Sequence, residues 1–228
     1  MREFAVGECA VVIGAGGIGA ALADALRAEG RLVLVLGRAT GLDLLDEASI
    51  AAAAGLVAQA GVPRLVVDAT GFLHGGGFVP ERSWRELDPV HMAQAFAVNA
   101  IGPALLMKHF LPLLPRQGIA VFATLSARVG SIGDNRLGGW YSYRASKAAL
   151  NQLVRTAAVE LKRRAPEAVC VALHPGTVAT GLSAPFARSG LEVRPAAQAA
   201  GELLAVIAGL KPADSGGFFD HKGIAVPW

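Results

Sequence analysis

The sequence has little of several features that mark other classes of protein. Only two cysteines occur in 228 residues, and Cys9 and Cys170 both fall in apolar runs, where a buried thiol is expected rather than a disulfide. Five histidines without paired ligand spacing give a metal site no support. No apolar run reaches the roughly 18 residues of a membrane span, and the first residues lack a signal peptide's apolar core. We therefore expect a cytoplasmic protein with neither a metal nor a membrane partner.

Basic residues are in slight excess, but they are scattered. The 21 lysines and arginines against 18 acidic residues give a net charge of +3 and a pI near 9.1. The one cluster, Lys162-Arg-Arg164, ends a predicted helix, where cations complement the helix dipole. No stripe of basic and aromatic residues is present, so we expect no nucleic-acid partner. The length suits one large α/β domain over residues 1–228.

Apolar, strand-like runs alternate with helical segments along the whole chain. The expected strands are 9–14, 31–36, 65–69, 119–125, 168–174 and 217–219, and the expected helices are 18–29, 47–60, 89–111, 139–164 and 196–208. This alternation predicts right-handed crossovers and a single-domain, Rossmann-type, doubly wound parallel sheet.

The first predicted strand runs directly into a glycine loop. Gly14-Ala-Gly-Gly-Ile-Gly19 lies between the apolar run 9–13 and a helical, alanine-rich segment. Strand, Gly-x-Gly-x-x-Gly and helix together bring backbone N–H groups and a helix N-terminus up to a pyrophosphate. A β-carbon would block that close approach, so glycine is required. We expect the loop to bind a dinucleotide.

A tyrosine and a lysine lie four residues apart in the run Tyr141-Ser-Tyr-Arg-Ala-Ser-Lys147. On a helix, Tyr143 and Lys147 share one face. A nearby positive charge favours the phenolate, so we expect Lys147 to lower the pKa of Tyr143. That shift would make the tyrosine a usable general acid or base. Alone, the pattern also fits an ordinary helix surface.

Further motifs follow in a fixed order. They are Asp68-Ala-Thr-Gly71, Asn99 in Val-Asn-Ala-Ile-Gly, the run Gly130–Trp140, and Pro175-Gly-Thr-Val-Ala-Thr180. With the glycine loop and the Tyr143–Lys147 pair, this order resembles the short-chain dehydrogenase/reductases, and within them the C-factor-like and sniffer-like carbonyl reductases. The resemblance covers nearly the whole chain.

The resemblance implies an oxidoreductase that interconverts a small-molecule carbonyl and an alcohol with a nicotinamide cofactor. Tyr143 would exchange the proton, Lys147 would hold the ribose, and Asn99 would hold a water linked to Lys147. The implied cofactor-binding residues are Gly14, Gly16, Gly17, Ile18, Gly19, Arg38, Asp43, Ala69, Thr70, Gly71, Tyr143, Lys147, Pro175, Gly176, Val178 and Thr180.

The end of the second predicted strand favours NADP(H) over NAD(H). An acidic residue there would accept hydrogen bonds from the ribose 2′-hydroxyl and repel a 2′-phosphate. This strand ends in Gly37-Arg38-Ala-Thr40, so that acid is absent. Arg38 can form charge-assisted bonds to a phosphate, and Thr40 can add a hydroxyl.

The catalytic serine departs from the family pattern. In Leu125-Ser-Ala-Arg-Val-Gly130, alignment puts Ala127 where the family has its catalytic serine. We expect Ser126 to take the role, while Ser131, or no serine at all, remains open. Either hydroxyl could instead satisfy local backbone groups.

Two other departures concern loops. The glycine loop is one residue shorter than the family's usual one. Between residues 36 and 47 there is no room for the family's helix and third strand, so we expect a shortened crossover. We interpret Leu42-Asp43-Leu44 as a remnant of that strand, with Asp43 near the adenine.

Several remaining side chains have two interpretations. We expect His74 to be a solvated loop residue and His174 to make a structural hydrogen bond. Trp140, Tyr141, Phe186 and Phe72 fit either an apolar substrate wall or core packing, and residues 181–195 stand where the family has its substrate lid.

The departures also keep a second function open, a C-factor-like signalling or cofactor-sensing protein with little turnover. Association of two copies through the long central helices, common in the family, is left open by the sequence.

Overall fold

The computed structural model describes residues 5–182, 184–186 and 193–228. Its parallel sheet has the order β2-β1-β3-β4-β5-β6. The strands are β1 (Glu8–Ile13), β2 (Val33–Leu36), β3 (Val62–Asp68), β4 (Val121–Leu125), β5 (Val169–His174) and β6 (Phe218–Asp220). The main helices are α1 (Gly17–Ala28), α2 (Glu47–Ala60), α3 (Pro89–Phe96), α4 (Gly102–Phe110), α5 (Tyr141–Arg164) and α6 (Ala196–Gly209). The predicted doubly wound sheet is confirmed.

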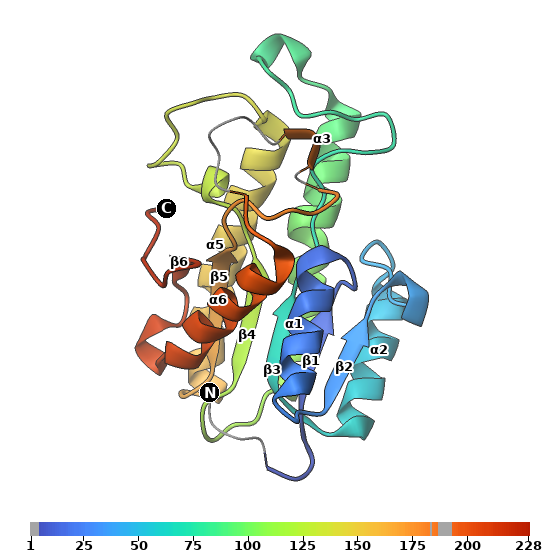
Figure 1. The fold of residues 1–228 in the computed structure, drawn as a ribbon, viewed down its shortest axis with the longest axis vertical. Coiled ribbons are helices and arrows are strands. Elements are labelled where there is room, and N and C mark those ends of the chain that lie inside the picture. The colour runs from blue at the N-terminus through green and yellow to red at the C-terminus, as the bar shows by residue number, and fades with distance from the viewer. Residues whose placement is uncertain (1–4, 183, 187–192) are drawn as a thin grey trace.

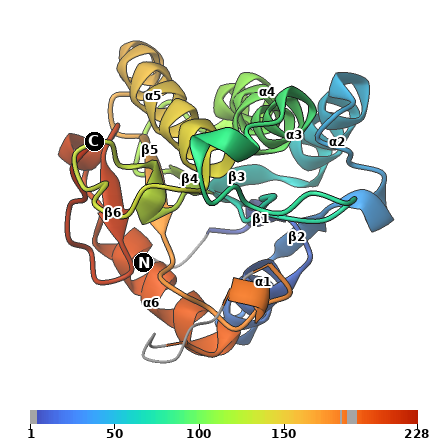
Figure 2. The same ribbon diagram turned by 90° about the horizontal axis from the view of Figure 1, so that it is seen from above.

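Helices cover both faces of this sheet. Figure 2 shows α1 and α6 on one face and α2, α3, α4 and α5 on the other. Side chains alternate between the faces along a strand, so β1 contributes to two cores. Val11 and Ile13 belong to the core shared with α2, α4 and α5, whereas Ala10 and Val12 belong to the core shared with α1 and α6. This burial on both faces explains why the strands are apolar throughout.

The connection between β2 and α2 is short, as expected, but the interpretation of Leu42–Leu44 as a strand is wrong. The chain makes a 3₁₀ turn at Arg38–Thr40 and enters α2 at Glu47, with Asp46 accepting a hydrogen bond from the N–H of Ala48 at 3.0 Å. Leu42 is buried in the core, and Leu44 packs against the same core. The connection from β2 to α2 is so short that its apolar side chains pack into the core, and its main chain does not form a strand beside β2.

The predicted helix 89–111 is interrupted. A π-turn at Ala97–Ile101 separates α3 from α4 and contains Asn99. π-turns inside α-helices are rare and often lie at functional sites.

The helical stretch Pro89–Leu113 contains an 18-residue window with a mean hydropathy of 1.3, so it is long and apolar enough to cross a membrane by length and composition alone. It contains no continuous apolar run of that length, because isolated polar residues such as His91 and Lys108 interrupt it. Leu106 and Phe110 of this stretch are fully buried in the core beneath the sheet.

Candidate active site

Most of the predicted site residues gather beyond the carboxyl ends of the strands. Loops that follow β1, β2, β3, β4 and β5 meet at this edge, in the upper part of Figure 1. The strand order reverses direction between β1 and β3, and ligands of open α/β sheets bind in the crevice at such a switch point.

The positions of the glycine loop require glycine for two different physical reasons. A β-carbon on Gly19 would lie 1.8 Å from the carbonyl oxygen of Gly14, so the loop itself leaves no room. Gly14 also has φ +100 and lies against the backbone of Ala69. A β-carbon on Gly16, the N-cap of α1, would meet no atom within 4 Å, so this position leaves open space at a helix N-terminus. That space fits the pyrophosphate of a dinucleotide.

The glycine loop also touches the Pro175–Thr180 loop. A β-carbon on Gly17 would lie 2.6 Å from Cγ2 of Thr180. The main chain of the second loop is held in turn by Arg194, whose N–H donates to the oxygen of Thr177 at 3.0 Å. Val178 is buried beside it. Two segments that are far apart in the sequence therefore form one edge of the site.

Arg38 is exposed at the end of β2, in the position that the sequence predicted. The hydroxyl of Thr40 is already engaged, because it donates to the oxygen and accepts from the N–H of Gly37, both at 2.9 Å. Asp43 accepts from the N–H of Leu45 at 3.0 Å. Thr40 thus closes the turn, and Arg38 alone extends from it as a candidate phosphate ligand.

Lys147 is a buried cation at the centre of the site. Its side chain is 2% exposed, and its Nζ donates to the oxygen of Leu125, at the end of β4, at 2.8 Å. Burial lowers its pKa to about 8, an effect that the charge of Asp68 opposes. A β-carbon on Gly71 would lie 3.7 Å from Lys147 Nζ and equally far from Asn99 Oδ1, so these three residues converge.

Tyr143 lies one helical turn before Lys147, whose Nζ is 6.0 Å from the centroid of the tyrosine ring. The expected lowering of the Tyr143 pKa is wrong for this structure, because burial raises it to about 12. Burial disfavours the phenolate, and Lys147 directs its ammonium to a backbone carbonyl.

Asn99 braces the loop that follows β3. Its Oδ1 accepts from the N–H of Phe72 at 2.7 Å, and its Nδ2 donates to the oxygen of Phe72 at 2.8 Å. Nδ2 also donates to Ser146 Oγ at 3.1 Å, which links the π-turn to α5. Asn99 and Lys147 both reach Gly71, and the role of Asn99 in holding a water stays a prediction.

Both candidate serines already have hydrogen-bond partners. The hydroxyl of Ser126 donates to Oδ1 of Asn151, one turn beyond Lys147, at 2.6 Å. Ser131 Oγ accepts from the N–H of Asp134 at 3.1 Å. Both serines are buried. A role for Ser126 at a carbonyl oxygen would require its hydroxyl to turn from Asn151, so the choice between the serines stays open.

Asp68 is a residue of the site whose individual importance the sequence did not indicate. Its side chain is fully buried. Oδ1 accepts from the N–H of Thr70 at 3.0 Å and from the Thr70 hydroxyl at 2.6 Å. Oδ2 accepts from the Thr124 hydroxyl at 2.6 Å. Burial raises the pKa of this carboxyl, while its hydrogen bonds and the charge of Lys147 act in the opposite direction. The pairing of Asp68 with Thr124 across β3 and β4 appears only in the sheet register.

Aromatic side chains stand beside Tyr143. The Trp140 ring centroid is 6.2 Å from that of Tyr143 and 5.4 Å from that of Phe186. The ring centroids of Phe186 and His74 are 5.3 Å apart. His74 is partly exposed, and its Nε2 lies 3.1 Å from the oxygen of Gly181, so the histidine that we expected to be solvated also contacts the chain. Of the predicted lid 181–195, residues 183 and 187–192 lie outside the described residues.

His174 ends β5, and burial lowers its pKa to about 4. Its Nδ1 is buried, and within the described ranges no hydrogen-bond partner accounts for it, so the expected structural hydrogen bond is not found at that atom. No group of three or more potential metal ligands gathers among the described residues.

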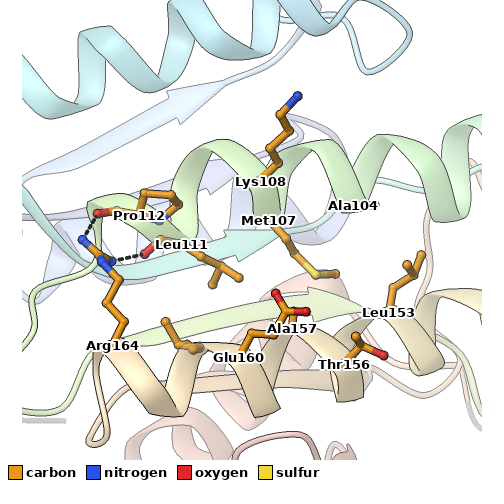
Figure 3. A pocket seen from close by; sticks show the side chains of 11 residues that line it. Ala104, Met107, Lys108, Leu111, Pro112, Leu153, Thr156, Ala157, Glu160 and Arg164 are labelled. Atoms are coloured by element: carbon orange, nitrogen blue, oxygen red, sulfur yellow. Dashed lines mark hydrogen bonds between the residues drawn. The ribbon is translucent and has the colours of Figure 1, made fainter.

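A separate cavity of about 380 Å³ lies between α4 and α5 and shares no residue with the predicted site (Figure 3). Met107 and Leu153 line it, and Arg164 closes one end by donating to the oxygens of Leu111 and Pro112 at 3.1 and 2.5 Å. One residue of the basic cluster at the end of α5, Arg164, therefore has partners within the chain.

Comparisons with known proteins agree with this geometry. The chain is 41% identical to C-signal of Myxococcus xanthus over 144 residues, which are 63% of this chain and 82% of that protein. It is 32% identical over 188 residues to 1-hydroxy-2-glutathionyl-2-methyl-3-butene dehydrogenase of Rhodococcus sp. (strain AD45), covering 82% and 79% of the two chains. An NADPH-bound carbonyl reductase from chicken fatty liver superposes with a TM-score of 0.82 at 26% identity, covering 96% of this chain and 98% of that one. The family model for short chain dehydrogenases matches residues 8–189, and the chain therefore belongs to the short-chain dehydrogenase family.

Proposed function

As a member of this family the chain is an oxidoreductase, and we propose that it is an NADP(H)-dependent carbonyl reductase with Tyr143 as the general acid and base. The observation that carries the proposal is the convergence of Gly71, Asn99 and Lys147, with Lys147 Nζ 6.0 Å from the ring centroid of Tyr143. A buried cation that remains largely protonated at neutral pH is costly, and such residues cluster at functional sites.

The residues at the strand ends fit a dinucleotide. The open space at Gly16 and the N-terminus of α1 would hold the pyrophosphate, and Arg38 would bind a 2′-phosphate. Ala69, Thr70 and the Pro175–Thr180 loop would complete the site. The bound nicotinamide would supply or accept the hydride, which protein side chains cannot do.

The chain's own residues would donate the proton to the substrate and stabilise the charge that remains. In the reductive direction the Tyr143 hydroxyl donates its proton to the developing alkoxide, and the Lys147 ammonium stabilises the phenolate that remains. The raised pKa of Tyr143 keeps the phenol protonated beforehand, which suits an acid. Ser126 would donate a hydrogen bond to the same oxygen after its hydroxyl leaves Asn151.

The preference for NADP(H) rests on Arg38 and on the lack of an acidic residue from Gly37 to Thr40. The chicken carbonyl reductase was solved with NADPH bound, which supports the same choice of cofactor.

Depletion of NADPH with a panel of aldehydes and ketones tests the proposal. We expect turnover by the wild type and none by Tyr143→Phe, which loses one hydroxyl but keeps the ring that packs on Trp140. Both proteins should bind NADPH with similar Kd values. Equal turnover by the two would disprove the role of Tyr143. NADPH binding with no turnover of any carbonyl would instead favour the cofactor-sensing alternative.

A further inference from the structure

The helix that bears Tyr143 begins without a capping side chain of its own. Trp140, at the N-cap of α5, makes no side-chain capping bond, and the first turn contains no acidic residue. The first N–H groups of a helix have no acceptor within it, so an uncapped end frays unless another group accepts them. Ser142 and Tyr143 are the second and third residues of this helix. Fraying here would displace the phenol.

The missing cap comes from Glu81, in the loop between β3 and α3. Its two carboxylate oxygens accept from the N–H of Ser142 at 3.3 and 3.2 Å, and Oε1 also accepts from the Ser142 hydroxyl. The residue is 2% exposed, and Nδ1 of the buried His91 lies 3.4 Å from Oε1. Acidic residues are almost never fully buried unless they are paired. An anion at this end of the helix also complements the helix dipole.

The main chain of Glu81 holds the turn that precedes the helix. Its carbonyl oxygen accepts from the N–H of Trp140 at 2.5 Å, and a β-carbon on Gly139 would lie 3.3 Å from the same oxygen. Trp140 has φ 54, and it is the one non-glycine residue with positive φ in the described part of the chain. Such a conformation is strained for a residue with a side chain, and it persists where the surroundings fix it. The Trp140 ring then packs on Tyr143.

We propose that Glu81 is a positioning residue for Tyr143, because its buried carboxylate and its carbonyl fasten the turn at Trp140 and the first turn of α5. Only the consequence for turnover rests on the proposed function. Misplacement of a reacting group by about 1 Å can lower a rate by about 10²-fold. The groups proposed to hold the pyrophosphate and 2′-phosphate lie on other elements, at Gly16 and Arg38. Loss of the contacts that Glu81 makes with Trp140 and Ser142 should therefore lower kcat more than it weakens cofactor binding.

The first test is Glu81→Gln, which keeps the size of the side chain but replaces one accepting oxygen by an NH₂ donor. We expect kcat to fall by about tenfold or more, with the Kd of NADPH nearly unchanged. The matched control is Glu86→Gln in the same loop, where the exposed carboxylate accepts from the N–H of Arg82 at 2.7 Å. The control should retain both values.

A second measurement does not depend on turnover. The chain has two tyrosines, so Tyr141→Phe leaves Tyr143 as the only phenol. Burial raises the pKa of Tyr143 to about 12, and phenolate absorbance in the near ultraviolet follows its ionisation. If Glu81 holds the turn, adding Glu81→Gln admits water, and phenolate should appear at a lower pH, toward the ordinary value of 10.0.

Lower kcat and earlier ionisation in Glu81→Gln, with Glu86→Gln unchanged, would support the proposal. Unchanged kcat and ionisation would overturn it. If the wild type reduces no carbonyl, the proposed function fails, yet the titration still decides whether Glu81 holds Tyr143. If Glu81→Gln does not fold, Glu81→Asp keeps the charge but shortens the side chain that reaches the Ser142 N–H, and an unchanged titration in that variant would overturn the proposal equally.

Discussion

Lys147 should lower the stability of the folded protein, and Lys147→Met measures by how much. The side chain is 2% exposed, and burial lowers its pKa from 10.5 to about 8. One pKa unit corresponds to about 1.4 kcal/mol, so burying this charge disfavours folding by roughly 3 kcal/mol. Methionine has a similar length and no charge. Its gain is partly offset by the lost hydrogen bond to the oxygen of Leu125.

The pH dependence isolates the contribution of this charge. The folded protein releases the Lys147 proton near pH 8, whereas the unfolded chain keeps it until about pH 10.5. Between those values the unfolded state binds more protons, so this group makes the free energy of unfolding rise with pH. From about pH 7 to about pH 9.5, the wild type should gain about 2 kcal/mol of stability relative to Lys147→Met.

Urea unfolding, followed by the fluorescence of the three tryptophans, measures this difference at both pH values. Comparison with wild type cancels the buried groups common to both proteins, such as Cys170, whose pKa burial raises to about 12. Lys162→Met removes an exposed lysine from the same helix and should show no such change. A stability difference for Lys147→Met that is equal at both pH values would refute the reasoning.

Five further substitutions test other parts of the site. Arg38→Ala should weaken NADPH binding and leave NADH binding unchanged at one ionic strength, and an unaltered ratio of the two Kd values would exclude Arg38 as the phosphate ligand. Gly19→Ala should lower Tm, because its β-carbon would lie 1.8 Å from a backbone oxygen, whereas Gly16→Ala should keep Tm but weaken NADPH binding. Ser126→Ala should lower kcat by roughly 10²–10³ if this hydroxyl stabilises the carbonyl oxygen. Near-normal kcat in that variant, with a large loss in Ser131→Ala, would transfer the role.

The order of strands and helices could be predicted because their signals are local. A run such as Cys9–Ile13 is apolar throughout, and it lies between helices on both faces of the sheet. The predicted element ends differ from the observed ones by a few residues. The incorrect strand at Leu42–Leu44 shows the limit of such signals, because apolar side chains beside a sheet edge can pack into the core without pairing.

The sequence alone indicated which chemistry to expect of the chain. The spacing of Tyr143 and Lys147, the glycine loop and the strand-end Arg38 are local features, and the fold keeps each in the place that its spacing implied. Only the tertiary structure decided the environment of these groups. The sheet register sets Thr124 against Asp68, 56 residues away, and the loop before α3 brings Glu81 to Ser142, 61 residues away. Burial then raises the pKa of Tyr143 instead of lowering it, because desolvation depends on everything that surrounds a group and not on its neighbours in sequence.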